Sequence, residues 1–138
     1  MLKLNETSYN DYFITNNKNL LSLDKIYEFL SKSYWGKNRT KEKIKESIQN
    51  SECYGVYFKN EQVGFARIVT DYSVMFWLCD VYIDESHRKK GLGKKLMELI
   101  VNNEELKNLT GILGTMDAHS LYEKYGFVKE VLMRRKIN

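Results

Sequence analysis

The sequence predicts a single α/β (α+β) domain built on one central, mixed but mostly antiparallel, twisted sheet with helices on both faces. Two observations point to this class. Strand-like and helix-like stretches follow each other in the order β-α-α-β-β-β-α-β-α-β, which favours a sheet covered by helices. The chain has 138 residues, 43% of them hydrophobic, and no repeat, linker or low-complexity tract divides it, so we expect one domain over residues 1–138.

The N-terminal part is expected to form one short strand and two helices. Tyr12–Thr15 is the strand. Residues 24–34 predict a helix because their apolar residues fall on one face, and Ser22 or Asp24 can cap it. After a break at a glycine, a threonine suited to an N-cap precedes the second helix, Lys41–Gln49.

The middle of the chain predicts three strands that form an antiparallel meander. These are residues 54–59, 62–71 and 73–83, with tight turns at 60–61 and 71–73.

The C-terminal third predicts two helices and two strands. Residues 91–102 form the strongest helix, since their leucine and isoleucine side chains share one stripe. Residues 109–114 are expected to be a buried strand, and 118–125 a short helix that ends at a glycine. Residues 127–136 are expected to close the sheet.

The composition excludes several functional classes. The longest uninterrupted apolar run, residues 74–79, is too short to span a membrane, and the first residues lack a signal-peptide core. Cys53 and Cys79 have no metal-ligand or CxxC spacing, so we expect no metal, no disulfide and a cytoplasmic location. The net charge of +4 comes from scattered lysines, so we expect neither a nucleic-acid nor a membrane partner.

The most informative stretch is residues 81–93, VYIDESHRKKGLG, in which an apolar strand runs through a polar turn into a helix. The turn ends in Arg88-x-x-Gly91-x-Gly93. This order places free backbone N–H groups and the positive end of a helix dipole at the tip of a strand, which favours pyrophosphate binding. Four basic side chains add positive charge there: Arg88, Lys89, Lys90 and Lys94.

Two common glycine motifs do not fit this turn. A P-loop requires glycine where Arg88 stands and Ser or Thr where Lys95 stands. A dinucleotide fingerprint requires a third glycine where Leu96 stands. The remaining pattern, R-x-x-G-x-G, lets the backbone approach phosphates closely; the alternative is a glycine-rich turn that binds nothing.

A second motif follows in residues 118–127, AHSLYEKYGF. Together the two segments resemble the GNAT superfamily of acyl-CoA-dependent N-acyltransferases, whose pyrophosphate loop reads [RQ]-x-x-G-x-[GA] and whose later segment reads A-x-x-L-Y-x-x-x-G-F. The resemblance covers roughly residues 54–136, and both motifs occur in the family's order. The segments SYW at 33–35, VGFAR at 63–67 and TMDAH at 115–119 look like a group of short bacterial GNAT proteins of unassigned substrate.

The resemblance implies that acetyl-CoA binds where two strands splay apart, with its pantetheine arm paired to the backbone like an added strand. A primary amine of a small molecule, peptide or protein would attack the thioester directly, and a backbone N–H near Val81 would stabilise the tetrahedral oxyanion. The implied cofactor-binding residues are Val81, Tyr82, Ile83, Arg88, Lys89, Lys90, Gly91, Leu92, Gly93 and Lys94. The alternative function is a non-catalytic acyl-CoA sensor.

Tyr122 matches the family's tyrosine that faces the CoA sulfur. A phenol with a pKa near ~10 can donate a proton to the leaving thiolate, whose thiol has a pKa near ~8.5. Asp80 is the first candidate for the general base, because it is an acid inside an apolar strand beside the expected acyl site; the alternative is a carboxylate held by structural hydrogen bonds or facing solvent. Glu52 is a further candidate because it begins a strand near the cleft. His119 is another, but a histidine on a helix surface is the commoner case, and Asp71 fits a turn better.

The resemblance also implies that the first two helices and their connection form the acceptor pocket. Tyr34, Trp35 and Arg39 lie there and could hold a flat or anionic substrate; packing of the helix end is the alternative. The cysteines are interpreted as small hydrophobes. Because many relatives pair through their final strands, residues 128–136 are the expected edge of a homodimer.

Overall fold

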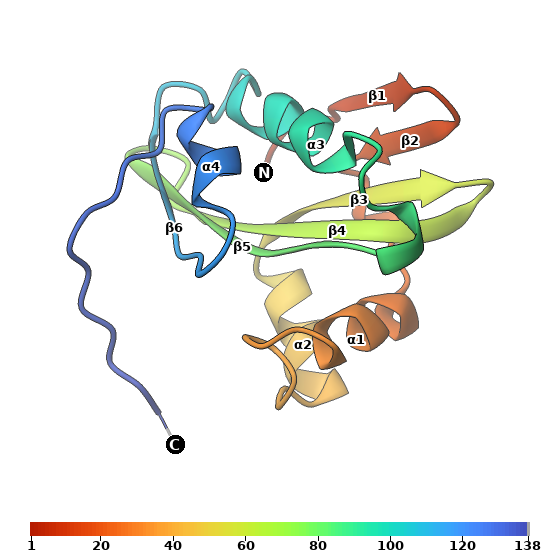
Figure 1. The fold of residues 1–138 in the computed structure, drawn as a ribbon, viewed down its shortest axis with the longest axis horizontal. Helices are drawn as coiled ribbons and strands as arrows, with labels where there is room; N and C mark the ends of the chain where they lie inside the picture. The colour runs from red at the N-terminus through yellow and green to blue at the C-terminus, as the bar shows by residue number, and fades with distance from the viewer. Residues whose placement is uncertain (138) are drawn as a thin grey trace.

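The computed structural model describes residues 1–137 as a six-stranded sheet with helices on both faces (Figure 1), which confirms the predicted fold class. Neighbouring strands follow chain order from β1 to β6; the first five are antiparallel, and β6 runs parallel to β5. None of the helices in these residues is long and apolar enough to cross a membrane. The strands are β1 Glu6–Tyr9, β2 Tyr12–Thr15, β3 Glu52–Phe58, β4 Glu61–Thr70, β5 Met75–Ile83 and β6 Thr110–Leu113. The helices are α1 Leu23–Ser31, α2 Lys41–Gln49, α3 Leu92–Val101 and α4 His119–Glu123, with short 3-10 turns at Lys18–Leu20 and Glu85–His87.

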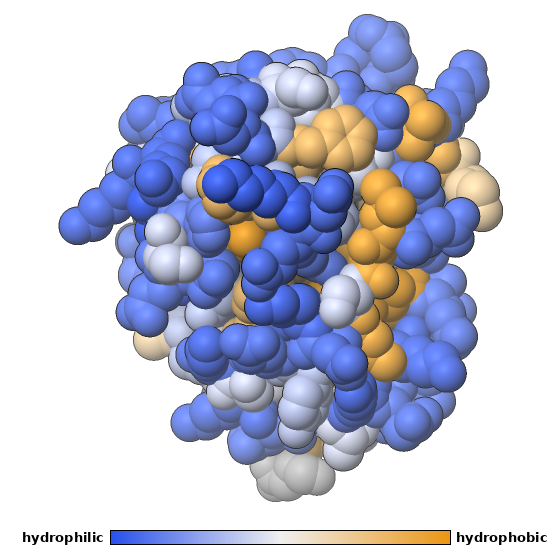
Figure 2. Space-filling model, turned by 90° about the vertical axis from the view of Figure 1, so that its right-hand side faces the viewer, coloured by the Kyte–Doolittle hydropathy of each residue, from blue (hydrophilic) through white to orange (hydrophobic). Residues whose placement is uncertain are grey.

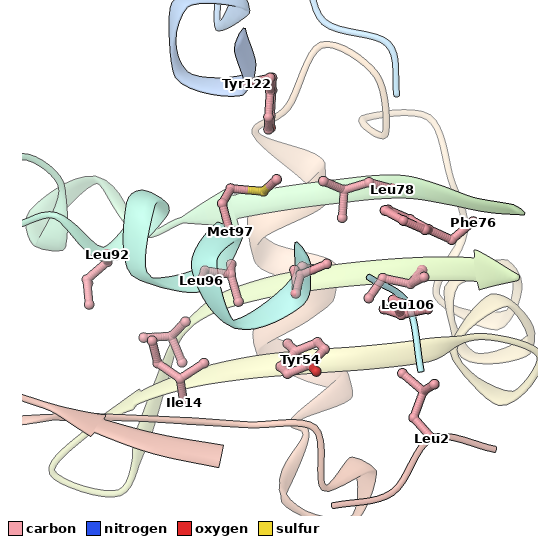
Figure 3. Close-up of a cluster of buried hydrophobic side chains, with 14 of the residues drawn as sticks. Leu2, Ile14, Tyr54, Phe76, Leu78, Leu92, Leu96, Met97, Leu106 and Tyr122 are labelled. Carbon is pink, nitrogen blue, oxygen red and sulfur yellow. The ribbon is translucent and has the colours of Figure 1, made fainter. Parts of the chain in front are cut away.

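Two clusters of buried side chains hold the layers together, one on each face of the sheet. On one face, α3 packs its apolar stripe on the strands (Figure 3) through residues that include Leu92, Leu96, Met97 and Ile100. On the other face, α1 and α2 cover β4 and β5 through residues that include Ile26, Phe29, Ile44, Phe65 and Tyr82. Each such fully buried side chain contributes about 1.5–3 kcal/mol. The end of the sheet that carries the β1–β2 and β3–β4 turns is mostly hydrophilic, with a narrow hydrophobic band (Figure 2).

The first two helices are capped as predicted, but α1 ends earlier. The side chain of Ser22 accepts a hydrogen bond from the Lys25 N–H, and a threonine does the same for α2. α1 stops at Ser31 because Ser33 Oγ donates to the Leu30 carbonyl and accepts from the Gly36 N–H. Residues 32–40 therefore form a loop between the two helices.

The first strand, β1, was absent from the sequence prediction. Its four residues, ETSY, alternate between exposed and half-buried positions and carry little apolar signal. The strand forms because Asn10, with φ +53°, turns the chain back and pairs Tyr9 directly opposite Tyr12.

The predicted last strand, residues 127–136, is wrong. Among the described residues, none beyond Glu123 belongs to a helix or a strand, and Val128, Val131 and Met133 are 75%, 101% and 94% exposed. The segment VLMRRKI groups its apolar and basic residues in blocks, so neither face of a strand would be uniformly apolar. β6 therefore forms an edge of the sheet and is half-buried, not buried as predicted.

Candidate active site

The loop that leads into α3, residues 88–94, is called the phosphate loop below. Within residues 1–137, the backbone N–H groups of residues 89–94 donate to no protein acceptor; the first to do so is that of Lys95, 3.0 Å from the Gly91 carbonyl. Lys89 and Gly91 have φ of +65° and +81°, so the chain curls in the left-handed region. A concave run of N–H groups at a helix N-terminus attracts anions.

Some side chains of the phosphate loop are held by the rest of the protein, and others are exposed and charged. Arg88 Nε donates to the Ile83 carbonyl at 2.8 Å, and its guanidinium lies 5.1 Å from the centroid of the Tyr82 ring. Leu92 is buried in the core, so only its backbone can face a ligand. The three lysines of the loop, Lys89, Lys90 and Lys94, are exposed.

β5 has an unpaired edge beside this loop. Within residues 1–137 it pairs with β6 only from Met75 to Leu78, and the edge beyond has no neighbouring strand. A bulge places two residues of β5, Asp80 and Val81, opposite Ala66 alone, and Asp80 has φ +54°. The side chains of Val81, Tyr82 and Ile83 pack into the two core clusters, so these residues offer a ligand their backbone. An extended chain can add to such an edge as a strand.

The second sequence motif lies next to the phosphate loop. Leu121 of α4 comes within 3.8 Å of the place where a Cβ on Gly93 would lie, and Tyr125 Oη donates to the Lys94 carbonyl at 3.0 Å. Tyr122 reaches from α4 toward Met97 (Figure 3) and is only 9% exposed. Burial is the main cause that raises the pKa of Tyr122 above its usual value, with smaller contributions from nearby ionisable groups. The phenol is therefore protonated at neutral pH.

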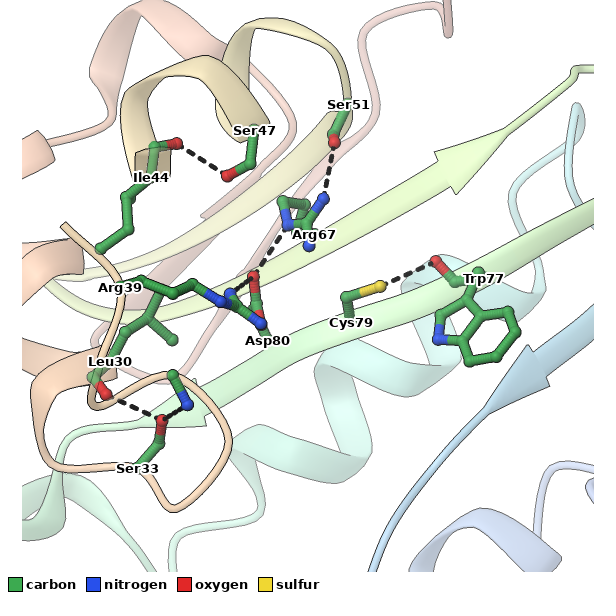
Figure 4. A network of polar contacts seen from close by, with 11 residues as sticks. Leu30, Ser33, Arg39, Ile44, Ser47, Ser51, Arg67, Trp77, Cys79 and Asp80 are labelled. Atoms are coloured by element: carbon green, nitrogen blue, oxygen red, sulfur yellow. Dashed lines mark hydrogen bonds and ion pairs between the residues drawn. The ribbon is translucent and has the colours of Figure 1, made fainter. Parts of the chain in front are cut away.

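Asp80 is the centre of a buried ion-pair network that also contains Arg39, Arg67 and Ser51 (Figure 4). Both carboxylate oxygens lie 2.8 Å from Arg39 Nη1, and Oδ2 lies 2.8 Å from Arg67 Nε. Only 1% of the Asp80 side chain is exposed. Of the two roles that the sequence left open for Asp80, this geometry supports a carboxylate held by structural hydrogen bonds.

Tyr34 joins the α1–α2 loop to the loop before α4. Its hydroxyl accepts a hydrogen bond from the Met116 N–H at 3.2 Å, and its ring meets that of Trp35 edge-on at 4.9 Å. Both rings are exposed, Tyr34 by 49% and Trp35 by 38%. The proximity of Tyr34 also contributes to the raised pKa of Tyr122. Of the predicted acceptor residues, Tyr34 thus lies near Tyr122, Trp35 packs on Tyr34, and Arg39 is tied to Asp80.

The remaining candidates have other surroundings. Glu52 is buried and accepts a hydrogen bond from Tyr72. Asp71 accepts hydrogen bonds from three N–H groups of its own turn, which lower its pKa and confirm it as a turn residue. Burial raises the pKa of the Cys53 thiol to about 12 and also raises that of Cys79, so neither is an activated nucleophile.

Sequence reasoning missed Arg67, which shares Asp80 with Arg39. A signal was present, because Arg67 stands in an otherwise apolar strand and Asp80 in the next one. A charged residue in each of two neighbouring strands indicates an ion pair across the sheet.

Comparison with known proteins identifies the family of this chain. Residues 49–129 match the sequence model described as the acetyltransferase (GNAT) domain. A solved GNAT-family structure from Xanthomonas campestris pv. campestris is 32% identical, with a TM-score of 0.86 over 91% of this chain and 93% of that one. An acetyl-CoA-bound GNAT acetyltransferase from Elizabethkingia anophelis shares the fold, at 18% identity and a TM-score of 0.64 over 85% of this chain and 76% of that one.

A Gibberella zeae protein, whose name describes it as a putative acetyltransferase, is 27% identical over 117 residues. The match spans 70% of this chain and 65% of that relative, which is less than two thirds of its length. The family match covers more than half of the present sequence and includes the phosphate loop and the Tyr122 motif. The chain belongs to the GNAT acetyltransferase family.

Proposed function

We propose that the protein is an N-acetyltransferase that moves an acetyl group from acetyl-CoA to a primary amine of a small molecule, peptide or protein. One observation carries the proposal: the N–H groups of residues 89–94, which have no protein acceptor within residues 1–137, lie beside an unpaired edge of β5. The loop suits a pyrophosphate, and the edge suits the amide-bearing pantetheine arm.

The residues at the loop fit CoA chemically. Gly91 has φ +81°, and a Cβ there would lie 2.6 Å from Tyr9 Oη, so any other residue would be strained and would displace the Tyr9 hydroxyl. The exposed Lys89, Lys90 and Lys94 can pair with phosphate oxygens, and the N–H groups can donate to them. When bound, acetyl-CoA supplies the activated acyl group.

In this proposal, Tyr122 donates a proton or hydrogen bond to the leaving thiolate, which its raised pKa suits. A backbone N–H at the Asp80–Val81 bulge stabilises the oxyanion, because a bulge removes a backbone group from the strand ladder. We assign Asp80 the role of holding Arg39 and Arg67 in place. The amine proton then leaves through water.

On the acceptor side, we propose that Tyr34, Trp35 and Arg39 contact the amine substrate. Two arginines and one aspartate leave one positive charge in the Asp80 network, which favours an acceptor that also carries an anionic or planar group.

A thermal-shift titration with acetyl-CoA, CoA and ATP tests the cofactor, and thiol release across an amine panel tests the reaction. We expect Tm to rise with both CoA species and not with ATP. No shift with millimolar CoA would contradict the proposal. A shift without thiol release from any amine would favour the acyl-CoA sensor.

We also propose that two copies associate through β6 and the exposed segment 128–137. β6 has β5 as its sole partner strand among the described residues, and Val128, Val131 and Met133, which follow α4, are exposed. Light scattering after size exclusion measures the mass; a monomer at 100 μM would contradict the association.

A further inference from the structure

The β1–β2 hairpin contacts the phosphate loop at Lys90 and the residue just before the loop, His87. Tyr9 Oη donates to the Lys90 carbonyl at 3.0 Å. Tyr12, which faces Tyr9 across the turn, forms a hydrogen bond of 2.8 Å with His87 Nδ1, just before Arg88. The hairpin therefore contacts the chain on both sides of the left-handed residue Lys89.

Both contacts are reinforced by packing. The Tyr12 ring lies edge-on to the His87 ring at 5.6 Å, and Phe58 lies 5.1 Å from the same imidazole. Lys95, in the first turn of α3, lies 5.9 Å from the centroid of the Tyr9 ring. Tyr12 is buried, whereas Tyr9 is half-buried and reaches the loop with its hydroxyl.

The contact from Tyr9 determines which way a free N–H group points. The Lys90 carbonyl and the Gly91 N–H belong to one trans peptide unit, so they point in opposite directions. When Tyr9 holds the carbonyl toward the hairpin, the Gly91 N–H points away from it, where it has no protein acceptor within residues 1–137.

The loop needs such support, because left-handed residues other than glycine are strained. Lys89 has φ +65°, and a residue other than glycine keeps this strained conformation only where the surrounding structure determines it. The hydrogen bonds to His87 and Lys90 hold the backbone on either side of Lys89.

We propose that Tyr9 and Tyr12 are positioning residues for the cofactor: the hairpin holds the phosphate loop in the shape that presents its N–H groups to the pyrophosphate. This inference rests on the proposed function, since it concerns how CoA is held. Neither tyrosine touches the reacting atoms in this proposal; each acts through the backbone of the loop.

The test compares two acetyl donors, acetyl-CoA and S-acetylpantetheine, which lacks the pyrophosphate. In Tyr9→Phe we expect the Kd of CoA to rise roughly three- to twelve-fold, which is the scale of one lost hydrogen bond. The kcat/KM for acetyl-CoA should fall by the same factor, while that for S-acetylpantetheine should stay within about twofold, because no phosphate is involved. Tyr12→Phe should act in the same direction.

Tyr125→Phe is the matched control. Its hydroxyl also donates to a backbone carbonyl at 3.0 Å, that of Lys94, but the N–H of that peptide unit already donates to the Gly91 carbonyl inside α3. It should leave the Kd of CoA within about twofold of wild type.

Unchanged CoA binding in Tyr9→Phe, or equal losses with both donors, would overturn the inference and leave the proposed function standing. Tm values measured in parallel distinguish misfolding from a local effect. Because Tyr9 is half-buried and Tyr12 is buried, Tyr9→Phe should disturb the fold less than Tyr12→Phe. A wild-type chain that does not bind CoA would overturn both.

Discussion

The phosphate loop and the proposed acceptor side differ in the groups that they offer a ligand. The phosphate loop offers backbone N–H groups that have no acceptor within residues 1–137. The proposed acceptor side consists of side chains that already have partners: Asp80 binds two arginines, and the Tyr34 hydroxyl accepts a hydrogen bond from the Met116 N–H. A backbone site is specified by glycines and a strand-to-helix order, so it is visible in the sequence. A side-chain site depends on which distant residues meet.

The largest effect is expected for Tyr122, the proposed proton donor. Tyr122→Phe should lower kcat by roughly ten- to a thousand-fold while the Kd of CoA changes little, because only the proton donor is lost. Since burial raises the pKa of Tyr122, the phenol stays protonated beyond the usual tyrosine value, and the alkaline limb that it causes in the kcat profile should lie above pH ~10. Steady-state kinetics against pH measure both.

Tyr125→Phe is the control for that experiment, since it removes a second hydroxyl from the same segment. Equal kcat in Tyr122→Phe and wild type would remove the proton-donor role.

The next largest effect is expected on CoA binding at the phosphate loop. Gly91→Ala forces a Cβ to within 2.6 Å of Tyr9 Oη, and at φ +81° it adds strain of about 1–2 kcal/mol. Together with the displaced Tyr9 hydrogen bond, this should weaken CoA binding by on the order of 30- to 100-fold, as calorimetry can measure.

Gly126→Ala is the matched comparison. Gly126 has a similar φ of +89°, but no atom lies within 4 Å of the added Cβ. It should lower Tm slightly and leave the Kd of CoA unchanged. If both alanine variants bind CoA equally, close approach at Gly91 does not matter.

A change in the Asp80 network should mainly lower the free energy of unfolding. Asp80→Asn leaves Arg39 and Arg67 without their carboxylate, and because the arginines are partly exposed we expect a loss of about 2–3 kcal/mol, or roughly 10 °C in Tm. Glu61→Gln removes an exposed partner of Lys25 and should change stability by less than about 1 kcal/mol. Loss of the acidic limb of kcat/KM in Asp80→Asn would instead identify Asp80 as the general base.

The smallest effect is expected for Tyr34, which joins the α1–α2 loop to the loop before α4. Tyr34→Phe removes the acceptor of the Met116 N–H, so the KM of the amine should rise roughly two- to five-fold with the Kd of CoA unchanged. Tyr27→Phe alters another exposed tyrosine, on α1, and should change neither constant. A larger change in CoA binding than in amine KM would place Tyr34 on the donor side.

Local signals account for the parts of the fold that were predicted correctly. α2 and its threonine cap were predicted to the residue, and the meander of β3 to β5 differs from its prediction by at most two residues at any end. β1 was missed because ETSY is a strand only when Tyr9 faces Tyr12. The last strand was predicted to close the sheet without an identified partner strand, and none of the described residues beyond Glu123 forms a strand.

The sequence by itself determined the phosphate loop, since Gly91 and Gly93 between a strand and an amphipathic helix are local features. It also determined the position of Tyr122 within its motif. Only the tertiary structure decided that Asp80 binds two arginines and that Tyr9 supports the loop, because these partners lie far apart in the chain. Contacts of this kind depend on how the sheet and helices pack, and no local pattern records them.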